Sequence, residues 1–336
     1  MNAPINIGVV GLGRLGRIYA GHFASRIHHA RLVAVTDVQA DVTAAVAAET
    51  GARACPDFES LVTHPEVDAV VVVTPTRYHH PVVLAAAAAG KAIFCEKPLS
   101  LDLAEGEAMR AAVNQHGIFF HLAFMRRFDP GYAAAQRAIA TGRIGAPLVF
   151  KSSSRDRNPP PLDYLRPENS GGLFIDMGIH DFDLARWFMG DVQSVHSTGG
   201  ALADPAVAEV GDVDNAFTSL VFASGMLGQV NLSRNGVYGY AIDTEIVGRD
   251  GTLRVGYDRE TPLQIMSAGH IGHDTVPGFL ERFAQAYLIQ LQDFVDRLRA
   301  GDAPAITCED GIAAQRIASA ATRSLHEDRR ITLDQD

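Results

Sequence analysis

The sequence predicts two domains: an α/β domain built on a doubly wound parallel sheet, and after it an α+β domain with a largely antiparallel, open sheet. The chain has 336 residues, more than the roughly 250 to 300 at which a single hydrophobic core stops growing. Before residue 124, short β-branched runs alternate with Ala-rich helical stretches, which indicates βαβ units. Beyond it, longer strand-like runs follow one another across turn residues, which indicates hairpins. We therefore expect domains over residues 1–123 and 124–336.

The first domain is expected to alternate strands with helices. Strands are predicted over residues 5–10, 32–36, 69–73 and 92–95, and helices over residues 15–25, 40–50 and 81–89. The run at 69–73 is apolar without alternation, which is typical of a parallel strand that is buried on both faces.

The second domain is expected to be built from hairpins and longer helices. Strands are predicted over residues 148–153, 193–198, 215–223, 225–232, 241–247 and 251–255, and helices over residues 173–189, 279–299 and 310–325. Ala223-Ser224-Gly225 and Arg249-Asp250-Gly251 stand between consecutive strands and predict antiparallel pairing there.

Charge and cysteine content limit the partners and the compartment. Lys and Arg total 29 against 39 Asp and Glu, a formal net charge of −10, whose field would repel nucleic acid or an anionic membrane. The longest apolar runs are far shorter than the roughly 18 residues of a membrane span. The chain has an odd number of cysteines, and they lack the spacing of metal ligands: Cys55, Cys95 and Cys308. We expect no disulfide framework, no metal site, and a cytoplasmic protein.

A glycine-rich turn follows the first predicted strand and opens the first helix. In Gly11-Leu12-Gly13-Arg14-Leu15-Gly16, the glycines would allow a tight turn, close approach of a pyrophosphate and close helix packing. Asp37 ends the second strand, 21 positions after Gly16, where a carboxylate can accept hydrogen bonds from an adenosine ribose. These features predict NAD binding. The alternative is a glycine turn that only packs a helix on a sheet.

The same carboxylate bears on the choice between NAD and NADP. Asp37 would repel a 2′-phosphate, and Val38 rather than an arginine follows it, so NAD is favoured over NADP. Arg14 and Arg17 would instead favour NADP, because either could contact a phosphate. They could equally belong to a solvated helix face.

Glu96-Lys97-Pro98 directly follows the predicted strand at 92–95, at the carboxyl edge of the sheet where ligands of open α/β folds bind. A lysine there could lie beside the nicotinamide and favour a developing alkoxide. Pro98 would fix the backbone that presents it. The alternative is a surface lysine at a strand end.

Asp176 and His180 are four residues apart in the predicted helix at 173–189, so both would project from one face. Histidine has an ordinary pKa of about 6.5, which suits proton acceptance near neutrality. A neighbouring carboxylate would orient it. Two alternatives are an ordinary surface pair and half of a metal site, for which no further ligand is evident.

Taken together, these motifs resemble the glucose-fructose oxidoreductase/inositol dehydrogenase/MocA family over essentially the whole chain. The shared features are the glycine-rich turn, Thr74-Pro75 with His79, Glu96-Lys97-Pro98, and Gly171-Gly172 followed by Asp176 and His180. The stretches at 124–129, 154–156 and 176–183 are most similar to those of inositol 2-dehydrogenases. The resemblance implies a Rossmann domain whose cofactor site includes Arg14, Leu15, Thr74, Pro75, His79, Glu96 and Lys97.

The resemblance also implies a reaction, the NAD-dependent oxidation of a ring secondary alcohol of myo- or scyllo-inositol to the ketone. His180 would be the base, Lys97 would polarise the hydroxyl, and Asp176 would orient the pair or hold a substrate hydroxyl. Arg127, Arg155 and Tyr238 would border the substrate. For Arg127 and Tyr238 the alternatives are a salt-bridged structural arginine and a core aromatic.

Other functions remain open from the sequence. A pyranose sugar presents a similar ring of hydroxyls, and some family members use bound NAD in an internal redox cycle. A non-catalytic NAD sensor is a third possibility, against which intact Lys97, Asp176 and His180 argue. The resemblance further implies a homotetramer, and an apolar sheet face left uncovered would favour such association.

Overall fold

The computed structural model describes residues 3–157, 159–257 and 259–333. The chain forms two compact units: the first contains the residues up to Phe124 together with Tyr287–Ile312, and the second contains Met125–Ala286 and the residues from Ala313 on. Residues 124–336 were predicted to form one domain. The structure differs, because residues 287–312 return to the first unit.

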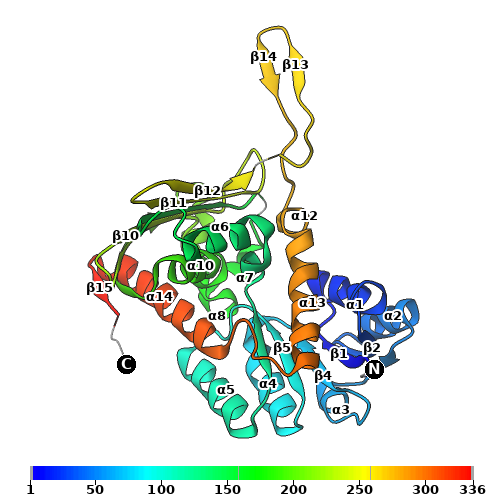
Figure 1. The fold of residues 1–336 in the computed structure, drawn as a ribbon. Helices are drawn as coiled ribbons and strands as arrows, with labels where there is room; N and C mark the ends of the chain where they lie inside the picture. Colours follow the sequence, from blue (N-terminus) through cyan, green and yellow to red (C-terminus); the bar gives the residue numbers. More distant parts are fainter. Residues whose placement is uncertain (1–2, 158, 258, 334–336) are drawn as a thin grey trace. The chain divides into compact units, whose positions relative to one another are not determined.

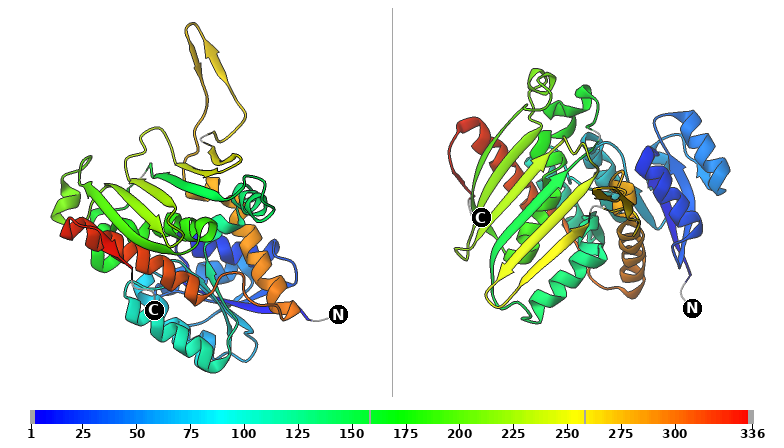
Figure 2. Two further views of the ribbon diagram at one scale, coloured as in Figure 1. Left: turned by 60° about the vertical axis from the view of Figure 1, so that its left-hand side comes forward. Right: turned by 90° about the horizontal axis from the view of Figure 1, so that it is seen from above.

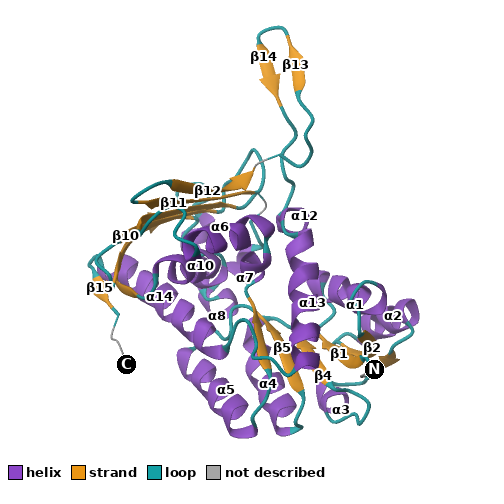
Figure 3. Ribbon diagram, in the orientation of Figure 1, coloured by secondary structure: helices purple, strands orange, loops and turns teal. Residues whose placement is uncertain are grey.

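The first unit is an α/β structure around a parallel sheet of order β3-β2-β1-β4-β5-β6 (Figure 1). Its elements are β1 (Ile5–Val10), α1 (Arg14–Ser25), β2 (Ala30–Thr36), α2 (Ala40–Thr50), β3 (Arg53–Ala54), α3 (Phe58–Val62), β4 (Ala69–Val72), η1 (Thr76–Tyr78), α4 (His79–Ala88), β5 (Ala92–Glu96), α5 (Leu103–His116) and β6 (Phe120–Ala123). Helices alternate with strands along the chain (Figure 3). All four residues of β4 are buried, as expected for a central parallel strand.

Helix α13 (Ala284–Ala300) supplies the late segment of the first unit. Its Phe294 meets Phe94 of β5 edge to face, with ring centroids 5.5 Å apart, and Gln290 hydrogen-bonds Tyr19 of α1. Phe294 is fully buried, so burial of this aromatic ring against the sheet explains why the segment belongs to the first unit rather than the second.

The second unit is an α+β structure around a sheet of order β12-β11-β7-β10-β9-β8-β15. Its strands are β7 (Pro147–Arg155), β8 (Val192–Gly200), β9 (Asn215–Phe222), β10 (Leu227–Ser233), β11 (Ala241–Gly248), β12 (Thr252–Tyr257) and β15 (Ile331–Thr332), with a separate hairpin of β13 (Ile265–Ser267) and β14 (His270–Gly272). Its helices are η2 (Met125–Phe128), α6 (Pro130–Ala140), α7 (Leu162–Leu165), α8 (Pro167–Ser170), α9 (Gly172–Asp176), α10 (Ile179–Met189), α11 (Ala206–Glu209), α12 (Phe279–Arg282) and α14 (Cys308–Glu327).

Strand pairing in this sheet is largely antiparallel: among the described residues, β7 and β10 form its one parallel pair. The two predicted hairpins, β9–β10 and β11–β12, are confirmed. Helices α6, α10 and α14 lie on one face of the sheet (Figure 2). The predicted fold class of both halves is therefore confirmed.

Two helices that were predicted to be continuous are each interrupted in the structure. The helix expected over residues 173–189 is split into α9 and α10, and the helix expected over residues 279–299 is split into α12 and α13. At the first break, the N–H groups of Met177 and Gly178 both donate to the carbonyl of Leu173. A Cβ at Gly178 would lie 2.8 Å from both the Phe174 carbonyl oxygen and Leu232 Cδ1. Only a glycine fits that close approach.

Candidate functional site

The glycine-rich turn lies at the centre of the parallel sheet, where β1 and β4 are neighbours and the strand order reverses. Gly11 has a φ of +92° and stands so close to Thr74 that a Cβ would be 2.7 Å from its nitrogen. A Cβ at Gly16 would be 2.0 Å from the Gly11 carbonyl oxygen. At Gly13, by contrast, a Cβ would meet nothing within 4 Å. The turn thus leaves open space at the N-terminus of α1, which fits a pyrophosphate.

Asp37 follows β2, and its carboxylate contacts the glycine-rich turn. Its carboxylate accepts hydrogen bonds from the N–H groups of Leu12, at 2.7 Å, and Gln39, at 3.0 Å. The residue is half-buried, and a carboxylate has lone pairs for further donors. The next residue, Val38, is 96% exposed. Because valine is uncharged, this position offers no cation for a 2′-phosphate.

The predicted cofactor residues Arg14 and Leu15 open α1, where Arg14 is exposed and Leu15 is half-buried. Arg17, one turn further, donates from Nε to the Leu12 carbonyl at 3.3 Å. Arg17 therefore has a structural contact of its own.

His79 is a buried brace between two loops. One ring nitrogen lies 2.9 Å from the Pro98 carbonyl oxygen and the other 3.0 Å from that of Thr74. Burial lowers its pKa, although the facing carbonyls favour the charged ring. This histidine holds Thr74 and the half-buried Lys97 loop at the same edge of the sheet.

Glu96 ends β5 as a buried carboxyl group. It accepts a hydrogen bond from Tyr19 Oη at 2.5 Å and one from the Lys97 N–H at 3.2 Å. Gln290 Nε2 in turn donates to Tyr19 Oη at 2.7 Å. Burial raises the pKa of Glu96 to about 7, against the opposing effects of Tyr19 and of the Lys97 charge. Sequence reasoning missed Tyr19 and Gln290; only the position of Tyr19 one turn after Gly16 on α1 could have indicated the former.

The raised pKa predicts a pH-dependent stability. Between the ordinary value near 4.5 and the folded value of about 7, the folded protein binds more protons at Glu96 than the unfolded chain. The free energy of unfolding therefore falls as pH rises across this interval, by an amount on the order of 3 kcal/mol. We expect urea unfolding of Glu96→Gln to lack this fall, and the exposed Glu49→Gln to retain it. Parallel pH curves for wild type and Glu96→Gln would contradict the assignment.

Asp176 and His180 lie on either side of the break between α9 and α10, so they do not share one continuous helix. Asp176 ends α9 and accepts hydrogen bonds from Arg234 Nη2 and Tyr164 Oη, each at 3.0 Å. His180, in the first turn of α10, is 6% exposed. The single helix predicted to carry both residues is therefore interrupted between them, at Met177 and Gly178.

Arg127 forms a forked ion pair with Asp183 of α10, through Nε at 3.0 Å and Nη2 at 2.5 Å, and its guanidinium lies 5.5 Å from the Trp187 ring centroid. The structure therefore contains the salt bridge that the alternative for Arg127 describes. Arg155 Nη1 donates to Asn231 Oδ1 at 3.2 Å.

Tyr238 lies in the loop between β10 and β11 and is 52% exposed. It is not a core aromatic, so that alternative is wrong. The Gly236 N–H of the same loop donates to the Asp156 carbonyl, which joins the loop to the end of β7. Sequence reasoning missed Tyr164, Asp212 and Arg234, which contact Asp176 or each other and carry no short motif.

Among the described residues, no helix is long and apolar enough to cross a membrane. Within residues 3–157, 159–257 and 259–333, no three His, Cys, Asp or Glu side chains are grouped so that they could hold a metal ion.

A parallel sheet of this order, with a glycine turn after β1 and a carboxylate after β2, defines an NAD-binding Rossmann protein. Residues 5–124 match the oxidoreductase family described by its NAD-binding Rossmann fold, and residues 136–333 match the C-terminal alpha/beta domain of the same family. The chain belongs to this GFO/IDH/MocA oxidoreductase family. The family and the NAD cofactor predicted from the sequence are thereby confirmed.

Several relatives are similar over their whole length. A scyllo-inositol 2-dehydrogenase (NAD(+)) of Bacillus subtilis is 38% identical over 99% of this chain and 98% of the relative. A myo-inositol 2-dehydrogenase of Thermotoga maritima is 40% identical over 98% and 99%. The crystal structure of a scyllo-inositol dehydrogenase from Lactobacillus casei, with bound NAD(H) and scyllo-inositol, matches with a TM-score of 0.92 at 34% identity, over 98% of this chain and 99% of that one.

Proposed function

We propose that this protein oxidises a ring secondary alcohol of a cyclitol, myo- or scyllo-inositol, to the inosose by hydride transfer to NAD. The observation that carries the proposal is end-to-end similarity to relatives named for that reaction, in a chain that retains Lys97, Asp176 and His180. The protein is thus an NAD-dependent oxidoreductase that acts on CH–OH.

Each residue would have a role that its surroundings support. NAD supplies the hydride acceptor when bound. We assign His180 as the base that takes the hydroxyl proton, Lys97 as the donor that favours the developing alkoxide, and Asp176 as the carboxylate that holds a hydroxyl. The half-buried Lys97 and the buried His180 are partly shielded from water, which strengthens such interactions.

The cofactor would be held by the turn at Gly11, Gly13 and Gly16, by Asp37 on the ribose, and by the Thr74-Pro75 segment that His79 braces. We further propose that Arg127, Arg155 and Tyr238 border the substrate. Asp183 and Asn231 orient the two guanidinium groups, and the exposed Tyr238 offers a phenol.

A screen for NADH release tests the function. The purified protein would be given NAD with myo-, scyllo- and chiro-inositols, glucose, galactose and xylose, and the absorbance of reduced nicotinamide would be followed. We expect the highest kcat/KM for an inositol. A higher kcat/KM for a pyranose would show that the substrate is a sugar rather than a cyclitol. Turnover without net NADH release would indicate an internal redox cycle.

Removal of the Asp37 carboxylate is expected to relax the preference for NAD over NADP. Asp37→Ala loses the charge that repels a 2′-phosphate and the acceptor for the Leu12 N–H, so the ratio of kcat/KM values should move toward NADP by about 10- to 100-fold, equivalent to about 1.4 to 3 kcal/mol. The exposed Asp41→Ala on the next helix is the matched control. An unchanged ratio in Asp37→Ala, or equal wild-type use of both cofactors, contradicts this role.

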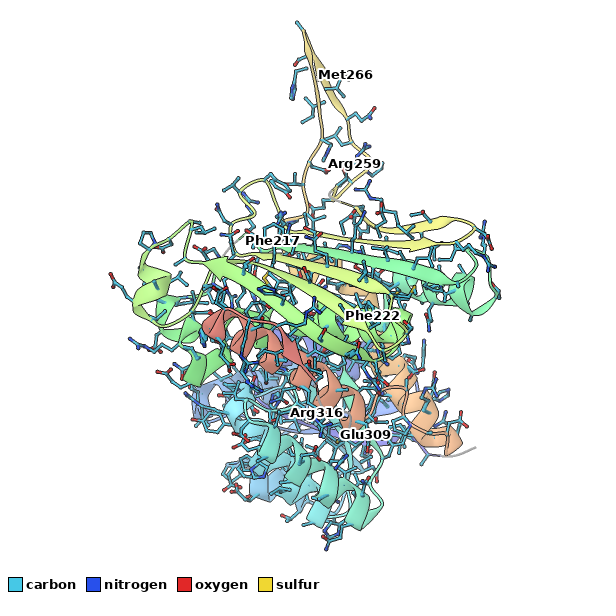
Figure 4. All side chains as sticks on the ribbon, turned by 90° about the vertical axis from the view of Figure 1, so that its left-hand side faces the viewer. Phe217, Phe222, Arg259, Met266, Glu309 and Arg316 are labelled. Atoms are coloured by element: carbon cyan, nitrogen blue, oxygen red, sulfur yellow. The ribbon has the colours of Figure 1, made fainter. Side chains whose placement is uncertain are left out.

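We also propose that the protein is a homotetramer. On the face of the second unit's sheet opposite the helices, Phe217 and Leu227 are 50% and 56% exposed, and Met266 on the projecting β13–β14 hairpin is 73% exposed (Figure 4). Exposed apolar surface of this kind is typical of subunit contacts. Sedimentation equilibrium tests the mass.

The expected compartment is the cytoplasm. Cys55, Cys95 and Cys308 are all buried free thiols, which suits a reducing environment.

A further inference from the structure

Asp176 and three polar side chains from other segments of the second unit, Tyr164, Asp212 and Arg234, form one cluster. Arg234 Nη2 lies 3.0 Å from Asp176 Oδ2 and 3.9 Å from Asp212 Oδ2. Tyr164 Oη donates to Asp176 Oδ1 at 3.0 Å. The side chains of Arg234, Asp212 and Asp176 are 2%, 6% and 15% exposed, so the charges are largely removed from water.

Both carboxylates of this cluster approach the guanidinium of Arg234. Burial raises the pKa of Asp212, Asp176 raises it further by repulsion, and Arg234 opposes both effects. Without the guanidinium, two negative groups would face each other in a poorly solvated site. The arginine therefore favours the charged form of the pair.

Asp212 is itself fixed to the helix that carries Asp176. Its Oδ1 accepts the N–H of Leu173 in the first turn of α9 at 2.9 Å, and Asp176 ends the same helix. The two contacts of Arg234 thus connect the start of α9 to its end, which defines the direction of the Asp176 carboxylate.

We propose that Arg234 is a positioning residue for Asp176, and that Asp212 is the counter-charge that holds Arg234 in place. This inference rests on the proposed function, in which Asp176 holds a substrate hydroxyl. Arg234 takes Oδ2, whereas Oδ1 accepts the hydroxyl of Tyr164. A carboxylate oxygen has lone pairs for a further donor, so Asp176 can also accept a substrate hydroxyl, and Arg234 keeps the carboxylate oriented.

Charge rescue separates positioning from a merely structural role. We expect Arg234→Gln to lower kcat/KM by about 10- to 100-fold, the scale of a misplaced catalytic group, and to move the acid limb of its pH profile to higher pH. Arg234→Gln/Asp212→Asn removes one charge of each sign, so it should recover about tenfold of the loss and move the acid limb back.

Arg282→Gln is the matched control, because Arg282 forms a comparably buried pair with Asp129 at 2.7 Å that does not involve Asp176. It should lower the melting temperature without moving the pH profile. If Arg234→Gln does not fold, Asp212→Asn provides the test. In that variant the charge of Arg234 is no longer shared with Asp212, so the acid limb of the pH profile should move to lower pH.

The outcomes distinguish this inference from the proposed function. Suppose that the wild type is active. An acid limb that does not move in Arg234→Gln or Asp212→Asn, or a double variant with a lower kcat/KM than Arg234→Gln, then overturns the positioning role alone. A wild type that releases no NADH from any cyclitol or sugar overturns the proposed function, and the positioning role with it.

Discussion

His180→Ala and Lys97→Ala are each expected to lower kcat for the cyclitol by about 10²- to 10⁴-fold, the usual contribution of a general acid or base. His180 would no longer accept the proton, and without Lys97 the alkoxide would form without its donor. NAD affinity, measured by calorimetry, should change little in His180→Ala, since the glycine turn and Asp37 are intact. Added imidazole should restore part of the turnover of His180→Ala if the side chain acts as a base.

Two substitutions of the same kind serve as controls. His196 is exposed on β8, and Lys91 Nζ donates to the carbonyls of His64 and Val67 rather than to the candidate site. His196→Ala and Lys91→Ala should retain wild-type kcat, although Lys91→Ala should be less stable. Full turnover in either site variant would remove that residue from the catalytic assignment.

The parallel sheet was predictable because its strands are buried on both faces and therefore continuous in apolar residues. Strand β4 is an example, predicted over 69–73 and observed at Ala69–Val72. Helix α5 was not predicted, although the sequence contains residues typical of both its ends. The carboxylate of Asp102 accepts the Ala104 N–H at the start, and Gly117 ends the helix in the left-handed conformation.

The break between α9 and α10 was not predictable in the same way. Leu232, a residue of β10, packs so close to Gly178 that a Cβ there would lie 2.8 Å from its Cδ1, and no local sequence pattern indicates such a contact. The period of the sequence is helical on both sides, so a single helix was the natural expectation.

The site shows the same division. Motifs predicted Lys97, Asp176 and His180 as site residues, because such a prediction depends on local residue type and spacing. Their partners lie far along the chain: Glu96 bonds Tyr19, 77 positions away, and Asp176 bonds Arg234, 58 positions away. Packing of separate elements brings such pairs together, and one sequence without an alignment does not contain that information.

Asp181→Asn is expected to destabilise the protein by about 3 to 5 kcal/mol, because it leaves the Arg126 guanidinium buried without its anion. The two groups are 3.0 Å apart with side chains 2% and 0% exposed. Ser152 and Ser154 hydroxyls also bond the carboxylate. Burial lowers the pKa of Arg126 and Asp181 raises it. Because a guanidinium is not deprotonated in proteins, the cation stays charged when Asp181 is replaced.

Urea unfolding followed by the fluorescence of Trp187, the single tryptophan of the chain, measures this loss at α10. Lys151→Ala is the control: it breaks the exposed pair with Glu245, 2.8 Å apart, which should cost at most about 1 kcal/mol. Equal losses in the two variants would show that the buried pair has no special contribution.

The apolar double replacement Arg126→Met/Asp181→Leu separates stability from positioning. Well-packed apolar residues often replace a buried ion pair at no cost in stability, so the double variant should be more stable than Asp181→Asn. Its kcat should nevertheless fall, because Asp181 directly follows His180 and its bonds to β7 fix the first turn of α10. Stability regained without turnover would mean that this buried pair serves the placement of the base, whereas recovery of both would leave it no role in placing His180.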